Sequence, residues 1–138
     1  MADLRVALRR FLHETARITR AGGLTPQRYD LLAVIRGSSS SGLNITELAN
    51  KLSLAPHSVS ELVDRASELG LVRRVDDSDD RRVARVQLTP EGTRRLDAAL
   101  VALRPEREAL YALLGDVYQH AGRLQLPTRA SGSRRASS

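Results

Sequence analysis

The 138-residue sequence contains no cysteine. Disulfides, thiolate metal ligands and cysteine-based redox sensing are therefore excluded for this chain. No apolar run approaches the ~20 residues that a membrane-spanning helix needs, and the first ten residues lack the continuous apolar core of a secretory signal. These absences lead us to expect a soluble cytoplasmic protein with no membrane partner.

Motifs for catalysis and for metal binding are also missing. The patterns G-x-x-x-x-G-K-[ST], H-E-x-x-H and G-x-S-x-G do not occur. The three histidines, His13, His57 and His120, do not have the spacing of metal ligands. We therefore expect neither an enzyme nor a bound metal or other cofactor.

The positive charge of the chain is concentrated at its C-terminal end. Four arginines after Gly122 supply +4 of the net charge of +6, which leaves +2 for the rest of the chain. The segment 123–138 is small, polar and free of acids, so we expect a basic disordered tail. A basic balance favours a nucleic-acid partner, but here most of the charge belongs to an accessory segment.

Helix start and stop signals divide the remaining sequence. An apolar stripe predicts a first helix over residues 1–22, formed by Leu4, Leu8, Phe11, Leu12 and Ile18. Thr25 and Pro26 are typical of the N-cap and first position of a second helix. The serine-rich segment 37–42 then reads as a flexible connector that is too short to separate domains.

Two short helices follow, with about four residues between them. Asn44 and Glu47 have the spacing of a capping box at the start of one helix, Pro56 begins the other, and Gly70 suits its end. Both helices carry apolar residues at i, i+3, i+4 and i+7, so each buries one stripe. This pair predicts a helix-turn-helix with a recognition helix over 56–69.

After Gly70 the sequence changes from helical to strand periodicity. Segments 71–75 and 83–88 are rich in β-branched residues, and apolar and polar side chains alternate in the second. The polar stretch between them, residues 76–82, reads D-D-S-D-D-R-R and is predicted to be the tip of a β-hairpin. A helix-turn-helix followed by a hairpin predicts a winged helix.

Four segments carry a more specific pattern. They are L-T-P-Q-R-Y-D-L-L at 24–32, I-T-E-L-A at 45–49, L-V-D-R-A-S-E-L-G-L-V at 62–72, and D-D-R-R-V-A-R-V-Q-L-T-P-E-G at 79–92. Through them the chain resembles the MarR (multiple antibiotic resistance regulator) family of bacterial transcription factors over roughly residues 4–120. The last segment is the most specific, because the family joins an Asp-x-Arg wing to a strand that ends in L-T-x-x-G.

The fold that we expect is mainly α (α+β). It is a winged helix-turn-helix over 24–92 with a two-stranded β wing, flanked by N- and C-terminal dimerisation helices over 1–22 and 93–122. The apolar stripes of these outer helices exceed what a winged helix of about 65 residues can cover, so a partner must bury them. The resemblance implies that this partner is a second copy of the chain, with interleaved terminal helices.

The resemblance also implies a function. A two-fold dimer places two recognition helices about one DNA turn apart, so it binds double-stranded DNA at palindromic promoter operators. Repression is the commoner result of such binding. Family members often bind a small aromatic or phenolic effector between the dimerisation helices and the winged helix, which releases the DNA.

An arginine at a hairpin tip is suited to the narrow minor groove of DNA. We interpret Asp80 and Arg82 as a structural ion pair of the wing and Arg81 as the groove or phosphate contact, although the two arginines are interchangeable in sequence terms. The alternative is a solvated charged loop without a partner. A calcium loop does not fit, because Arg82 stands where D-x-D-x-D-G requires glycine.

The predicted recognition helix exposes side chains that can read or clamp DNA. Hydroxyl and imidazole groups bond to bases or phosphates, Glu61 can accept from a cytosine amino group, and Arg65 suits a phosphate. Three acids outnumber the one arginine on this face, so affinity must come from the wing, the strands and the tail. The predicted DNA contacts are His57, Ser58, Ser60, Glu61, Arg65, Arg73, Arg74, Arg81, Arg82 and Arg85.

The acidic recognition helix leaves open an alternative of another class, a winged-helix protein-protein interaction module without specific DNA binding. Ala55 also stands where an N-cap side chain is expected. The candidate effector-binding residues are His13, Arg17, Tyr29 and Arg36, with Tyr111 and Tyr118 in the dimer region. Each of them could instead be a rim or core residue with satisfied hydrogen bonds.

Overall fold

The computed structural model describes residues 2–76 and 83–121. Within them lie six helices and a two-stranded antiparallel sheet, which confirms the predicted fold class. The elements are α1 (Ala2–Ala21), α2 (Pro26–Arg36), α3 (Ile45–Leu52), α4 (Pro56–Glu68), β1 (Val72–Asp76), β2 (Ala84–Leu88), α5 (Pro90–Ala102) and α6 (Arg104–Ala121). The predicted wing tip and the predicted basic tail lie outside the described residues.

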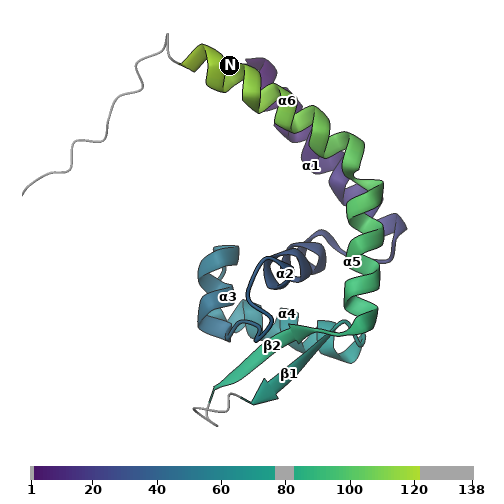
Figure 1. Ribbon diagram of the computed structural model, residues 1–138, viewed down its shortest axis with the longest axis vertical. Helices are drawn as coiled ribbons and strands as arrows, with labels where there is room; N and C mark the ends of the chain where they lie inside the picture. The colour runs from purple at the N-terminus through teal and green to yellow at the C-terminus, as the bar shows by residue number, and fades with distance from the viewer. Residues whose placement is uncertain (1, 77–82, 122–138) are drawn as a thin grey trace, which may run out of the picture.

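The chain forms two parts, which Figure 1 shows one above the other. Helices α2, α3 and α4 and the two strands make up the winged-helix part. Helices α1 and α6 lie side by side and extend away from it, and α5 joins the two parts. None of the helices in the described part of the chain is long and apolar enough to cross a membrane.

Local capping signals set the helix starts, as the sequence predicts. Thr25 Oγ1 accepts a hydrogen bond from Arg28 N at 3.2 Å. Asn44 Oδ1 accepts from Glu47 N at 2.8 Å, and Glu47 Oε1 accepts in return from Asn44 N at 3.3 Å, which completes the capping box. Ala55 provides no side-chain cap to α4, whose first position is proline. Helix α4 therefore begins without the ~1 kcal/mol that a capping side chain supplies.

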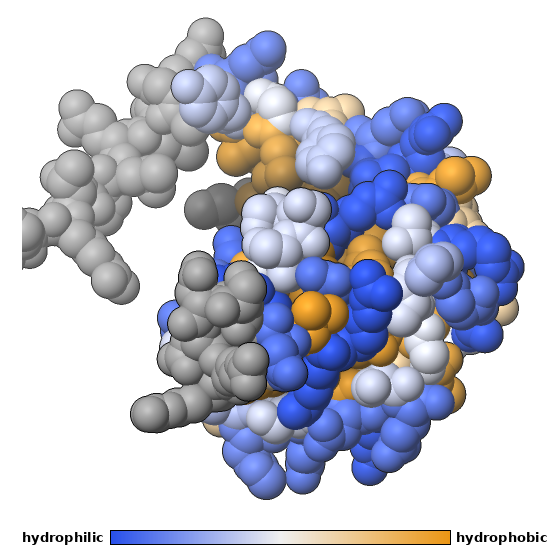
Figure 2. Space-filling model, turned by 60° about the horizontal axis from the view of Figure 1, so that its bottom comes forward, coloured by the Kyte–Doolittle hydropathy of each residue, from blue (hydrophilic) through white to orange (hydrophobic). Residues whose placement is uncertain are grey.

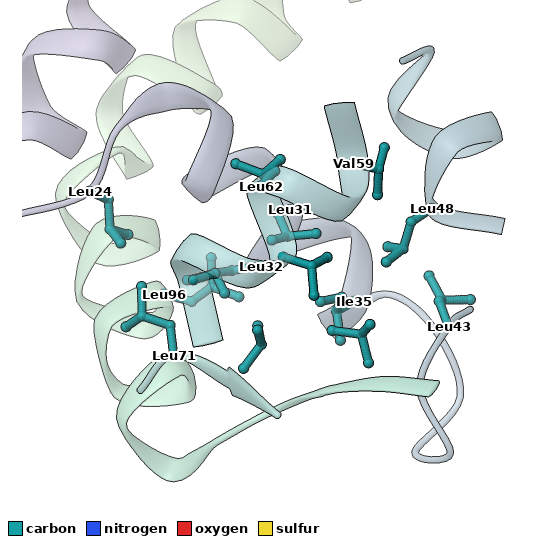
Figure 3. Close-up of a cluster of buried hydrophobic side chains, with 14 of the residues drawn as sticks. Leu24, Leu31, Leu32, Ile35, Leu43, Leu48, Val59, Leu62, Leu71 and Leu96 are labelled. Carbon is teal, nitrogen blue, oxygen red and sulfur yellow. The ribbon is translucent and has the colours of Figure 1, made fainter. Parts of the chain in front are cut away.

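The predicted apolar stripes of α2, α3 and α4 meet in one core inside the winged helix, between its helices and its two strands, as Figure 3 shows. Leu31 and Leu32 of α2, Leu48 of α3 and Val59 of α4 have no measurable exposure. Leu96 of α5 joins the same cluster. The core thus fixes α4 by one face and leaves its other face outward.

The sheet is extended by a contact that sequence periodicity does not reveal. Leu43 N donates to Val86 O at 3.1 Å, and Val86 N donates to Leu43 O at 2.7 Å, so the end of the serine-rich connector pairs with β2. Gly42, just before it, has φ +87°, and a Cβ there would overlap the carbonyl oxygen of Val86. The connector therefore ends in a fixed turn against the wing.

Candidate nucleic-acid interface

Helix α4 presents a polar face to solvent at its N-terminal end. His57 and Ser58 in the first turn and Glu61 in the second are exposed, and Ser60 is half-buried. The opposite side of the helix is buried in the core. In Figure 2 the lower face of the molecule is mostly hydrophilic, with isolated apolar side chains. Such a surface suits a polar, charged partner.

The acids of α4 are largely matched by nearby cationic or basic groups. Asp64 Oδ1 lies 2.6 Å from Arg74 Nη2 of β1, and Glu61 Oε1 lies 3.3 Å from His57 Nε2. The side chain of the third acid, Glu68, makes no hydrogen bond or ion pair within the part of the chain that the structure describes, and neither does the side chain of Arg65. The three acids on the exposed face of α4 would repel a phosphate backbone. Pairing two of them reduces this repulsion.

The strand arginines that the sequence assigns to DNA have partners within the winged helix. Arg73 Nη2 donates to Gln87 Oε1 on the neighbouring strand at 3.2 Å. Arg85 Nη1 lies 3.6 Å from Glu47 Oε1 of α3 and donates to Gly42 O at 3.3 Å. These contacts, together with the Asp64–Arg74 pair, connect both strands to their surroundings. Their DNA contacts stay predictions.

The wing is in the predicted place. Strands β1 and β2 pair in antiparallel register from Val72↔Leu88 to Asp76↔Ala84. Asp80, Arg81 and Arg82 lie between the two strands in the sequence and outside the described residues. Their roles as structural pair and groove contact stay predictions.

The four candidate effector-binding residues are spread over three regions. His13 and Arg17 lie exposed on α1, where Arg17 pairs with Glu14 at 2.9 Å. Arg36 pairs with Asp97 of α5, also at 2.9 Å. Tyr29 lies half-buried on α2. No hydrogen bond or ion pair joins any two of the four among the described residues.

Sequence reasoning missed Arg107 of α6, whose positive charge acts on Tyr29. Burial raises the pKa of Tyr29, and the positive charge of Arg107 opposes that rise. Arg107 Nη2 donates to Leu100 O at 3.0 Å, while its buried Nε has no hydrogen-bond partner in the described structure. Tyr111 also acts on Tyr29 from α6. Tyr29, Arg107 and Tyr111 are thus close enough to one another for their charges to interact.

A groove between the C-terminal end of α1 and helix α5 is a weaker candidate site for an anionic ligand. It encloses about 710 Å³ and is lined by Arg17, Arg94, Arg95 and small apolar residues. Arg94 and Arg95 both donate to Glu91, and these hydrogen bonds lower the pKa of Glu91 from 4.5 to about 2. Arg17 is paired as well. Because each cation already has a carboxylate, an anion would have to displace an ion pair.

The outer helices expose an apolar face. Its members each exceed a third of full exposure, and they are Val6, Leu8 and Leu12 of α1, Val101 of α5, and Tyr111, Leu114, Val117 and Tyr118 of α6. A groove of about 360 Å³ also runs between α1 and α6. In Figure 1 this pair of helices projects from the winged helix, and no other described segment covers it. We define these eight residues as the outer apolar face.

This architecture, with a core-anchored recognition helix, a hairpin beside it and an apolar helical extension, defines a winged helix-turn-helix protein of the type found in transcription regulators. Residues 22–83 match the MarR family model. The match covers a little under half of the chain, which over these residues is similar to the MarR family.

One curated relative is similar to the chain over a longer stretch. The chain is 35% identical over 91 residues to the HTH-type transcriptional regulator YhbI of Bacillus subtilis, a match that covers 66% of this chain and 58% of YhbI. The chain spans about half the length of the curated relatives it matches.

Solved structures share the fold. A mutant of MepR from S. aureus, bound to an oligodeoxyribonucleotide, superposes with a TM-score of 0.69 at 17% identity, covering 88% of this chain and 94% of MepR. CouR of Rhodococcus jostii RHA1, bound to p-coumaroyl-CoA, superposes with a TM-score of 0.69 at 24% identity, covering 89% of this chain and 91% of CouR.

Proposed function

We propose that this protein is a homodimeric, sequence-specific DNA-binding regulator that represses transcription from palindromic promoter operators. The observation that carries the proposal is the outward polar face of α4, placed beside a hairpin in a winged helix similar to the MarR family. A helix held only by its buried face is free to enter a major groove, and a hairpin next to it reaches the neighbouring minor groove. The DNA-bound state of MepR supports the same use of the fold.

The outer apolar face supports the dimer. Eight apolar side chains on three helices form a larger unpartnered surface than scattered exposure on a monomer requires. In a dimer with a second copy of the chain, each copy would cover the outer apolar face of the other, because a two-fold interface uses the same patch on both copies. The dimer then presents two α4 helices to one duplex, which is the physical basis of a palindromic operator.

A selection of bound sequences from random duplex DNA tests this proposal. At roughly physiological salt, the purified protein should enrich an inverted repeat whose half-sites lie about 10 base pairs apart. The expected spacing follows from the helical repeat of DNA, because both recognition helices of a two-fold dimer must face the same side of the duplex.

The matched variant replaces both Arg81 and Arg82 by alanine. This variant should lose operator binding while its dimer mass and melting temperature stay close to those of the wild type, since the change lies at the wing tip. Normal operator binding by the variant would contradict the role of the wing. Failure of a folded wild-type dimer to enrich any sequence would contradict specific DNA binding, and would favour a surface for another protein.

We further propose a small phenolic acid as the effector, bound near Tyr29 and Arg107. The buried, unpartnered Nε of Arg107 provides a hydrogen-bond donor for a carboxylate, and Tyr29 and Tyr111 provide aromatic surface. The p-coumaroyl-CoA complex of CouR shows that a relative in fold holds a phenolic compound.

A panel of hydroxybenzoates and hydroxycinnamates should therefore contain a compound that raises the melting temperature and weakens operator binding. A ligand at 100 times its Kd stabilises the protein by about 2.7 kcal/mol, which a melting assay detects easily. Replacing Arg107 by glutamine should remove that stabilisation, whereas the same replacement of Arg9, exposed on α1, should not. Equal loss in both variants would contradict the assignment of Arg107.

A further inference from the structure

The contact between Asp64 and Arg74 joins the recognition helix to the wing. Arg74 Nη2 lies 2.6 Å from Asp64 Oδ1, and the two residues are separated by ten positions and by the turn at Gly70. We propose that Asp64 is a specificity-determining positioning residue, which holds the Arg74 guanidinium against α4 and so keeps it from the DNA phosphates. This inference rests on the proposed DNA-binding function.

The strand geometry explains why Arg74 reaches α4. Side chains two apart on a strand point to the same side, so Arg74 lies on the side of β1 that carries Val72. Val72 is buried in the core that also holds the inner face of α4. Arg74 is therefore directed toward α4 at the margin of the core. Asp64 is the exposed residue of α4 that follows the buried Val63.

The pair is accessible to water and can open. The side chain of Arg74 is 42% exposed and that of Asp64 is 63% exposed. An exposed pair of this kind contributes little to fold stability, because solvent screens it. The main consequence of the pair is instead its effect on the affinity for DNA.

Free arginines at a DNA-binding surface contact phosphates, and such contacts strengthen binding to every sequence equally. An arginine that is already paired makes this contact only by leaving its carboxylate, which then faces the phosphates unpaired. The pair therefore weakens binding to random DNA. Contacts from α4 to base edges do not use Arg74, so the ratio of operator binding to random binding rises.

The test is the salt dependence of binding. In Asp64→Asn the carboxylate charge is removed at nearly constant size, so Arg74 is released to bind a phosphate. The slope of log K against log salt for a random duplex, measured between 50 and 200 mM salt, should become steeper by about 0.9. Random-duplex affinity should rise several-fold, and the ratio of operator affinity to random affinity should fall several-fold.

Two matched variants separate this role from simple charge loss. Glu68→Gln removes the same charge from the same helix, but Glu68 pairs with no described residue, so its slope should stay near that of the wild type. Adding Arg74→Ala to Asp64→Asn should return the slope to the wild-type value. A steep slope in Asp64→Asn that disappears in the double variant supports the inference.

Equal slopes in Asp64→Asn and Glu68→Gln would overturn the inference, as would a steep slope that survives in the double variant. A lower melting temperature without a change in slope would also overturn it, because that result describes a purely structural pair. These outcomes presuppose a wild-type protein that binds DNA. Absence of wild-type binding to any duplex would instead contradict the proposed function itself.

Discussion

Replacing Gly92 by alanine should lower the free energy of unfolding by several kcal/mol or prevent folding. A Cβ at Gly92 would overlap the carbonyl oxygen of Leu71 and stand 2.9 Å from the Leu71 carbonyl carbon. That carbonyl cannot move away easily, because Thr89 N donates to it at 3.1 Å. Thr89 Oγ1 in turn accepts from Gly92 N at 3.0 Å, which fixes the start of α5.

Alanine variants of two other glycines provide a comparison for this expected loss of stability. Gly115 lies within α6 with nothing near its missing Cβ, so Gly115→Ala should stabilise the helix by about 1 kcal/mol through helix propensity. Gly70 has φ +72° and open space around it, so Gly70→Ala should cost only the strain of a left-handed backbone, about 1–2 kcal/mol.

Urea unfolding followed by circular dichroism would rank the three variants. The order Gly92→Ala, Gly70→Ala, Gly115→Ala, from least to most stable, would support a steric role for Gly92. If the Gly92→Ala protein unfolded at the same urea concentration as the wild type, α5 would be able to shift at low cost. This result would contradict a fixed contact between Gly92 and the Leu71 carbonyl.

Gly92 also illustrates what the sequence can and cannot predict. Its place in L-T-P-E-G contributes to the resemblance to the MarR family, but the resemblance gives no physical reason for a glycine. The reason is that α5 approaches the Leu71 carbonyl closely. The periodicity of the sequence does not show how these two segments pack against each other. Local signals such as the Thr25 cap and the Asn44 capping box were predictable, because both partners lie within three residues of each other.

The candidate sites follow the same division. The outward face of α4 was predictable, since a helical period fixes which side chains are buried. The partners of those side chains were not, because the Asp64–Arg74 pair and the Leu43–Val86 bridge depend on how β1 and β2 pack. The effector candidates were chosen by residue type near a predicted junction, and Arg107 was missed because its neighbour Tyr29 lies 78 positions away in the chain.

Replacing Leu114 by glutamate should dissociate the proposed dimer. Leu114 belongs to the outer apolar face and is 42% exposed in the single chain, so a little under half of its surface remains for a partner to cover. Fully burying a leucine contributes roughly 1.5–3 kcal/mol, so the exposed part contributes about 1 kcal/mol, and a two-fold interface counts the change twice. Burying the glutamate charge adds to the loss, and a total of about 3 kcal/mol corresponds to a dimer Kd about 100-fold higher.

Sedimentation across a range of protein concentrations would measure this change. Gln119→Glu places the same charge on an exposed polar position of the same helix, so its dimer should match that of the wild type. Circular dichroism should show that the Leu114→Glu monomer keeps its helices. A Leu114→Glu protein of unchanged dimer mass would contradict the outer apolar face as the interface.

The same variant separates the contributions of the winged helix and the dimer to DNA recognition. A monomer retains its α4 and its wing, so Leu114→Glu should still bind random duplex DNA with a shallower salt slope than the dimer, because it neutralises fewer phosphates. Its preference for an inverted repeat should disappear, since one recognition helix reads one half-site. Persistence of that preference in a confirmed monomer would mean that two chains assemble on the operator itself, with DNA rather than the outer apolar face holding them together.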